Sequence, residues 1–166
     1  MNDTNINPED KAILEKATPE LKEKFFKAVL SDQSFTYQES LFDGQLTVEF
    51  RAPSIQEMNH IYAQLKKDEL ENILTTDATY IMKLTNYRLA VAIVKMNNEP
   101  FLSEFTEEKY TPTDSADSYL KARLKVIESW PIFKLSVIAE AHKQFENLVI
   151  VLTKEINTPG FWKAAE

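Results

Sequence analysis

The chain has 166 residues, 43% of them apolar, and a formal net charge of −7; this length predicts one folded domain over residues 1–166. It contains no cysteine and only two glycines, which excludes disulfides, cysteine nucleophiles and thiolate metal sites and argues against glycine-rich phosphate loops. The acidic balance argues against nucleic acid as a partner, because the chain would repel a phosphate backbone.

The N-terminal part of the chain predicts a leader and two helices. Residues 1–7 are polar and are expected to form a flexible leader, which does not resemble a signal peptide. A short helix is expected over residues 8–16. Thr18-Pro19-Glu20 then has the features of a helix start, because it offers a capping hydroxyl, a proline in the first turn and an acid near the positive end of the helix dipole. The second helix is expected to follow from there.

The next segment changes from helical to alternating periodicity. Apolar and polar residues alternate on both sides of Asp43-Gly44. The apolar members are Phe35, Tyr37 and Leu41 before the pair and Leu46, Val48 and Phe50 after it. Two period-two runs around Asp-Gly are a hairpin signal, because glycine tolerates the positive φ that such turns need. The sequence therefore predicts a β-hairpin over residues 34–51.

Residues 54–95 are predicted to be mainly helical. Ser54 and Glu57 form a capping box at the start. The charged stretch 66–72 fits either a solvated continuation of this helix or a break in it. A further helix has a stripe spaced four, three, four and three, made of Tyr80, Leu84, Tyr87, Val91 and Val94. Asn97-Asn98 predicts a turn, and its flanks at 91–96 and 101–102 suggest a second small hairpin.

The C-terminal third predicts a linker followed by two long helices. Residues 103–117 are acidic and rich in Thr and Ser, which is typical of a linker. Residues 118–157 are helical in pattern but are divided by Trp130-Pro131, since proline cannot continue a helix. The last helix has a stripe of Leu135, Ile138, His142, Phe145, Val149, Leu152 and Ile156. A stop at 157–160 leads into an aromatic tail, residues 158–166.

These elements together predict an α+β fold that is predominantly α-helical. We expect a helical bundle with a small N-terminal antiparallel β-hairpin. The core is expected to form between the two apolar stripes. The core of a domain of this size is not expected to cover both apolar stripes. We therefore also expect that one stripe lines a groove or forms the interface between copies in a homo-oligomer.

The sequence offers no catalytic constellation. His60 and His142 have no second histidine at helical spacing, so neither predicts a metal site. The carboxylate runs are typical of solvated faces, and no nucleophile elbow, phosphate loop or calcium loop is present. We therefore predict no catalytic, cofactor-binding or metal-binding residues, no cofactor, and a protein that is not an enzyme. No apolar run approaches the roughly 18 residues of a membrane span, so a membrane partner is not expected either.

Large aromatic residues are the candidate partner-binding residues. Trp130 and Trp162 bracket the last helix, Phe161 precedes the second tryptophan, and Phe145 lies in the stripe between them. Aromatic side chains dominate interface hot spots, so these four are predicted to contact a partner. The alternative for Phe161 and Trp162 is that they fold back onto this chain as a terminal anchor.

Three segments resemble parts of small bacteriophage tail-assembly proteins. The first is the strand from Leu46 to Phe50 that leads through Pro53-Ser54 into a helix. The second is the helix from Tyr87 that runs into the turn at Asn97-Asn98, where the family commonly has an Asn-Gly-like centre. The third is the long helix after Trp130-Pro131 that ends near 158–163. The resemblance covers about residues 35–163 and is to tail assembly chaperones and the related chaperones or accessory subunits of the baseplate hub.

The resemblance implies a viral protein that acts in virion assembly. Such chaperones bind exposed apolar helices of a tape-measure or baseplate hub protein, in the cytoplasm of the infected bacterial host, until the tail polymerises. The family defines no active-site residues that could be transferred to this chain. The alternative function is a structural subunit of the tail or baseplate that is retained in the virion. A third is a small enzyme that uses surface carboxylates.

Overall fold

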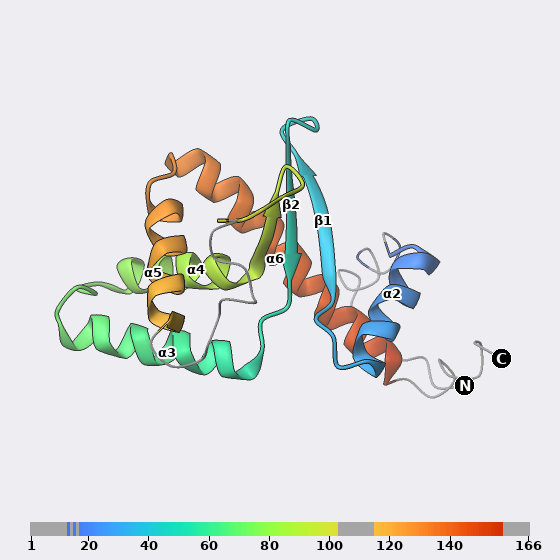
Figure 1. Cartoon of the computed structure of the whole chain (residues 1–166), viewed down its shortest axis with the longest axis horizontal. Helices are drawn as coiled ribbons and strands as arrows, with labels where there is room; N and C mark the ends of the chain where they lie inside the picture. The colour runs from blue at the N-terminus through green and yellow to red at the C-terminus, as the bar shows by residue number, and fades with distance from the viewer. Residues whose placement is uncertain (1–12, 14, 16, 103–114, 158–166) are drawn as a thin grey trace. The chain divides into compact units, whose positions relative to one another are not determined.

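The computed structural model describes residues 17–102 and 115–157, together with Ile13 and Glu15 (Figure 1). Over these residues the chain is α+β and predominantly α-helical, which confirms the predicted fold class. The expected leader at 1–7, the aromatic tail at 158–166 and most of the helix at 8–16 and of the linker at 103–117 lie outside the described residues. No described helix combines the length and the apolar character that crossing a membrane requires.

The chain divides into two compact units, and each is described by itself. The first unit consists of the residues before Thr36 and those after His142, and the second runs from Thr36 to His142. The long helix α6 (Ile132–Ile156) contributes to both. The expectation of one domain stays a prediction.

The first unit contains α2 (Pro19–Leu30), which starts as predicted. Thr18 is its N-cap, and the hydroxyl of Thr18 accepts a hydrogen bond of 3.2 Å from the backbone N–H of Leu21. A hydroxyl in this position satisfies one of the amides that the first turn leaves without a partner. Phe25 of the same helix is buried and packs edge-on against Phe35, with 5.1 Å between ring centres.

The second unit contains a four-stranded antiparallel sheet in the order β1-β2-β3-β4. The strands are β1 (Thr36–Leu41), β2 (Leu46–Arg51), β3 (Ile93–Met96) and β4 (Glu99–Pro100). The segment predicted as a hairpin at 34–51 thus supplies β1 and β2, and β3 and β4 extend the sheet. Asn97 and Asn98 join β3 to β4 with positive φ values of 52° and 65°, a conformation that asparagine accepts more readily than most residues.

The helices of the second unit are α3 (Ile55–Leu70), α4 (Asp77–Ala92), α5 (Ser115–Glu128) and the first part of α6. The Ser54–Glu57 capping box forms as predicted, and α3 continues into the charged stretch 66–72 and ends within it at Leu70. A positive φ at Asn72 follows it. α5 begins at Ser115, inside the segment that the sequence suggested was a linker, and ends before Trp130-Pro131. The bundle arrangement of the helices stays a prediction.

Burial around α4 is wider than its predicted stripe. In its last two turns, Tyr87 and Val91 of the stripe are buried, but so are Leu89, Ala90 and Ala92. α4 packs against both α3 and α5 and leads directly into β3. A helix with neighbours on several sides does not have the one-sided apolar pattern that periodicity detects. The predicted stripe therefore did not include all the buried residues of α4.

Candidate functional site

Phe145 lies in the core of the first unit. Its side chain is only 2% exposed and stacks on Phe35, with 6.1 Å between ring centres. Lys22 of α2 makes an ion pair of 2.8 Å with Glu155, so α2 is also joined to the last turns of α6. Packing alone explains Phe145 in this structure, and a partner could reach its ring only if these helices separated.

Trp130 lies between α5 and α6 in the second unit and is half-buried. Its ring centre is 6.0 Å from that of Phe101, and the amine of Lys134 lies 4.6 Å from the centre of its ring. A cation over an indole face is a favourable contact. The exposed part of Trp130 keeps it available to a partner. Phe161 and Trp162 lie outside the described residues, so the predicted contact at the chain end stays a prediction.

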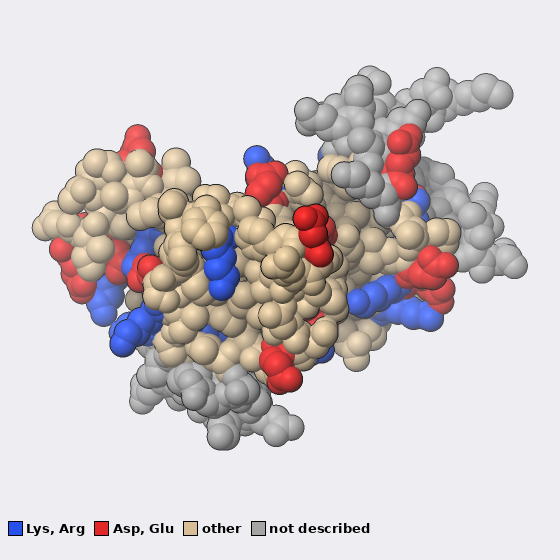
Figure 2. Space-filling view, turned by 90° about the horizontal axis from the view of Figure 1, so that it is seen from above, with Lys and Arg blue, Asp and Glu red and all other residues tan. Residues whose placement is uncertain are grey.

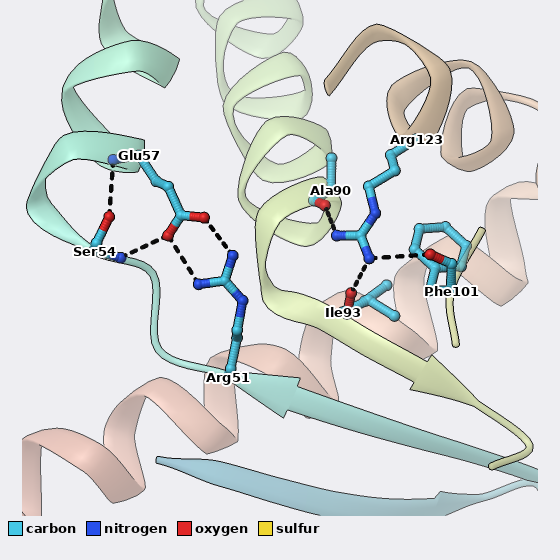
Figure 3. A network of polar contacts seen from close by, with 7 residues as sticks. All are labelled: Arg51, Ser54, Glu57, Ala90, Ile93, Phe101 and Arg123. Carbon is cyan, nitrogen blue, oxygen red and sulfur yellow. Dashed lines mark hydrogen bonds and ion pairs between the residues drawn. The ribbon is translucent and has the colours of Figure 1, made fainter. Parts of the chain in front are cut away.

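Arg123 is the most heavily used polar side chain among the described residues of the second unit, and the sequence analysis did not single it out. It is 4% exposed, and its guanidinium donates hydrogen bonds to the carbonyls of Ala90, Ile93 and Phe101 (Figure 3). The bonds to Ile93 and Phe101 measure 2.7 and 3.2 Å. Two of these carbonyls belong to the end of α4, where the helix dipole is negative and a cation is stabilising.

The rings of Phe101 and Tyr119 enclose the same guanidinium, 4.9 and 4.6 Å from its central carbon. Arg123 therefore joins α5 to the end of α4 and to the residue that follows β4. The sequence contains a signal for this role, because Arg123 is three residues after Leu120 and four before Ile127. It interrupts the apolar face of α5, and a charge at such a position is expected to have buried partners.

A second polar cluster fixes the start of α3. The guanidinium of Arg51, at the end of β2, pairs with both carboxylate oxygens of Glu57, and one of those oxygens also accepts a 2.8 Å bond from the N–H of Ser54 (Figure 3). Burial raises the pKa of Glu57, but the hydrogen bonds and charge of Arg51 outweigh it, so the pKa lies below its usual 4.5. Both clusters in Figure 3 hold elements of the second unit together.

His142 is a buried histidine of the second unit. It is 4% exposed, and its ring centre lies 5.4 Å from that of Phe50. Burial, and then the positive charge of Arg88, lower its pKa to about 4. The ring is therefore neutral at neutral pH, as expected for a histidine in an apolar stripe.

Apolar side chains are exposed where α3 turns into α4. We define the α3–α4 tip as Leu70, Ile73, Tyr80, Ile81 and Met82, which are between 37% and 72% exposed. No residue of α4 before Asn86 is buried, so the first two turns of this helix are at least partly exposed. In Figure 2 the left-hand end, which corresponds to the α3–α4 turn in Figure 1, is largely uncharged with charged side chains at its borders. A second exposed apolar pair, Ile132 and Phe133, begins α6.

The α3–α4 tip is a feature that the sequence analysis missed. Its stripe assignment placed Tyr80 in the core, whereas the structure leaves Tyr80 exposed and buries only Tyr87 and Val91 of the stripe. The signal was present: Ile81 and Met82 follow Tyr80 directly, so three large apolar residues stand side by side on a helix and cannot all face one core. Such a run predicts either complete burial or an exposed contact surface.

The described residues contain no group of three or more side chains suited to hold a metal ion. Comparison with family models, with curated proteins and with solved structures gave no match for this chain.

Proposed function

We propose that this chain is a non-enzymatic assembly protein of a bacteriophage tail or baseplate. It would act in the cytoplasm of the infected host and hold apolar helices of a tape-measure or baseplate hub protein until they assemble. The observation that supports this function best is the α3–α4 tip, because five large apolar side chains around one turn are more than scattered exposure produces.

The physical mechanism of this function is burial of one face of a client helix. An amphipathic helix gains about 1.5–3 kcal/mol for each large apolar side chain that it removes from water. The tip supplies apolar surface for this contact. The net charge of −7 would keep the complex soluble until the client is incorporated into the tail or baseplate.

Several finer expectations belong to this proposal. The helices would be arranged as a bundle with the β1–β2 pair as an N-terminal hairpin. Trp130 would join the contact surface through its exposed part, and Phe161 and Trp162 would contact the client from the end of the chain. Helix capture requires neither a cofactor nor a metal.

The test is coexpression of the tagged chain with the proteins encoded by the reading frames that neighbour its gene, tail and baseplate proteins among them if the proposal is right. We expect one of these proteins to copurify and to become more soluble in the presence of the chain. Failure of every neighbouring tail and baseplate protein to copurify would contradict the function.

For the chain end, the test is the double variant Phe161→Ala/Trp162→Ala, which is expected to reduce client recovery. Unchanged recovery with a normally folded variant would remove these two residues from the contact.

Protein analysis of purified particles distinguishes the chaperone from the alternative function. A chaperone leaves before the particle is complete, so it is expected to be absent. A structural subunit of the tail or baseplate is present at a fixed copy number, and that result would favour the alternative.

A further inference from the structure

The charges next to the α3–α4 tip have one predominant sign. Between Asp68 and Met82 the chain contains four carboxylates and neither lysine nor arginine. Asp68 is buried and accepts a 2.9 Å hydrogen bond from the hydroxyl of Tyr87, so it does not face a partner. Glu69 is in an ion pair of 2.7 Å with Lys66.

Two exposed carboxylates therefore remain beside the tip. Glu71 and Asp77 are exposed and form no ion pair with a described residue. Of the nearby lysines, Lys83 pairs with Glu128 at 2.6 Å. Lys67 is exposed on α3 and offers one positive charge against the two negative ones. The surface that a partner meets is thus apolar, with a net negative border.

We propose that the α3–α4 tip binds an amphipathic helix with a stripe of apolar residues bordered by lysine or arginine. The apolar stripe would cover Ile73, Ile81 and Met82, and basic side chains beside it would reach Glu71 and Asp77. This rests on the proposed function, since the occupant is taken to be a client helix. It adds the place on this chain where the client binds and the charge that the client must have.

A second copy of this chain fits the same surface less well. Two tips brought together would place Glu71 and Asp77 of one copy near those of the other. Like charges at the border of an apolar contact oppose association, whereas a basic helix removes the repulsion. The negative charges of Glu71 and Asp77 therefore favour a basic partner over a second copy of the chain.

The experiment measures the binding of synthetic helices to the full-length chain by fluorescence anisotropy. The probe is a labelled peptide of about 18 residues, long enough to be helical, with leucines at helical spacing and lysines elsewhere. A control peptide has the same leucines with glutamate in place of lysine. The leucine–lysine peptide is expected to bind at least about tenfold more tightly than the control, with an affinity that falls as salt rises.

Paired variants separate the tip from the general acidity of the chain. Ile81→Ser/Met82→Ser is expected to weaken binding about tenfold or more, and Ile55→Ser/Tyr62→Ser, also exposed but earlier on α3, to leave it unchanged. Glu71→Gln/Asp77→Asn is expected to remove most of the salt dependence. Asp32→Asn/Asp43→Asn removes the same number of charges elsewhere, at positions with positive φ that asparagine accepts, and is expected to retain it. Circular dichroism confirms that each variant is folded.

Four outcomes would overturn the proposal. Equal affinity for both peptides would show that the charge border selects nothing. An effect of the control variants as large as that of the tip variants would show binding elsewhere. Sedimentation of the chain alone as a dimer that Ile81→Ser/Met82→Ser dissociates would show that a second copy covers the tip. If the peptide does not bind but a tail or hub protein still copurifies, this inference fails and the proposed function stands. If the peptide does not bind and no tail or hub protein copurifies, both the inference and the proposed function fail.

Discussion

Arg123 is a buried polar residue of the second unit with partners on several elements. Its guanidinium satisfies carbonyls of Ala90, Ile93 and Phe101 that lie where little water can reach. A buried carbonyl that loses its donor costs the folded state the free energy of its lost hydration. The loss is greater here because the positive charge also stabilises the end of α4.

Arg123→Leu is therefore expected to lower the free energy of unfolding by about 3 kcal/mol, since several buried acceptors lose their donor together. Urea denaturation followed by circular dichroism measures this. Lys121→Leu and Lys125→Leu are matched controls, because both are exposed on the same helix and lose the same charge. A change for Arg123→Leu no larger than that for the controls would mean that the carbonyls obtain their partners in another way.

His142 predicts a dependence of stability on pH. The unfolded chain binds a proton on this ring near its usual pKa of 6.5, whereas the folded chain resists protonation until about pH 4. The contribution of the neutral His142 ring to the free energy of unfolding is therefore fully present above pH 6.5. It decreases as the pH falls from 6.5 to 4 and does not change further below pH 4. Between pH 7 and pH 5 the expected loss is about 2 kcal/mol.

Denaturant unfolding at the two pH values tests this dependence. His142→Asn is expected to lose less stability over the same range, because its side chain does not titrate. Carboxylates such as Glu57, whose pKa is lowered below 4.5, contribute only at lower pH. If His142→Asn does not fold, the ring resonances of His142 in the unmodified chain still decide the matter, since they must remain those of a neutral ring at pH 5.

Among the elements, the β3–β4 turn depends most on the conformation of single residues. Asn97 and Asn98 both have positive φ, and the side-chain oxygen of Asn97 accepts a 3.0 Å hydrogen bond from the N–H of Thr47. The backbone N–H of Asn97 returns a 2.8 Å bond to the carbonyl of Thr47. The turn is thereby joined to β2, and its shape affects the register of the sheet.

Asn98→Gly is expected to leave stability unchanged or slightly increased, and Asn98→Val to lower the free energy of unfolding by about 1–2 kcal/mol, because a β-branched residue resists positive φ. Thermal unfolding compares the two. Because Asn98 is exposed, no loss of packing complicates the result. Equal stability of the two variants would contradict the left-handed conformation at this position.

Elements with local signals were predictable from the sequence. Thr18 and Ser54 begin helices where their capping patterns predicted, and Pro131 separates α5 from α6. The alternating segment around Gly44 does form paired strands. Each of these depends on neighbours within a few residues, which is the range over which propensity and capping act.

Features that depend on distant parts of the chain were not predictable in the same way. The pairing of β2 with β3 joins residues near 50 to residues near 95, and no local pattern specifies it. The burial of α4 on several sides and the role of Arg123 follow from what packs around them. The same limit explains the site: Phe145 is in the core because Phe35 stacks on it, whereas no residue of α4 before Asn86 is buried.

The function proposed for this protein depends on its exposed surface. Both compact units contain buried apolar residues, and the polar clusters around Arg51 and Arg123 connect elements within the second unit. The α3–α4 tip exposes five large apolar side chains around one turn, and burying them would have stabilised the chain. Their exposure is accounted for if another helix covers them.

In the proposed complex, a basic amphipathic helix binds the α3–α4 tip. Methyl NMR of the isoleucines and methionines in the full-length chain tests this contact during titration with the leucine–lysine peptide. We predict that the methyl signals of Ile73, Ile81 and Met82 change first and most, while those of the buried Ile61 and Ile93 stay in place. Binding of the peptide with no change at the tip, or with the largest changes at Ile132 or Ile150, would contradict the claim.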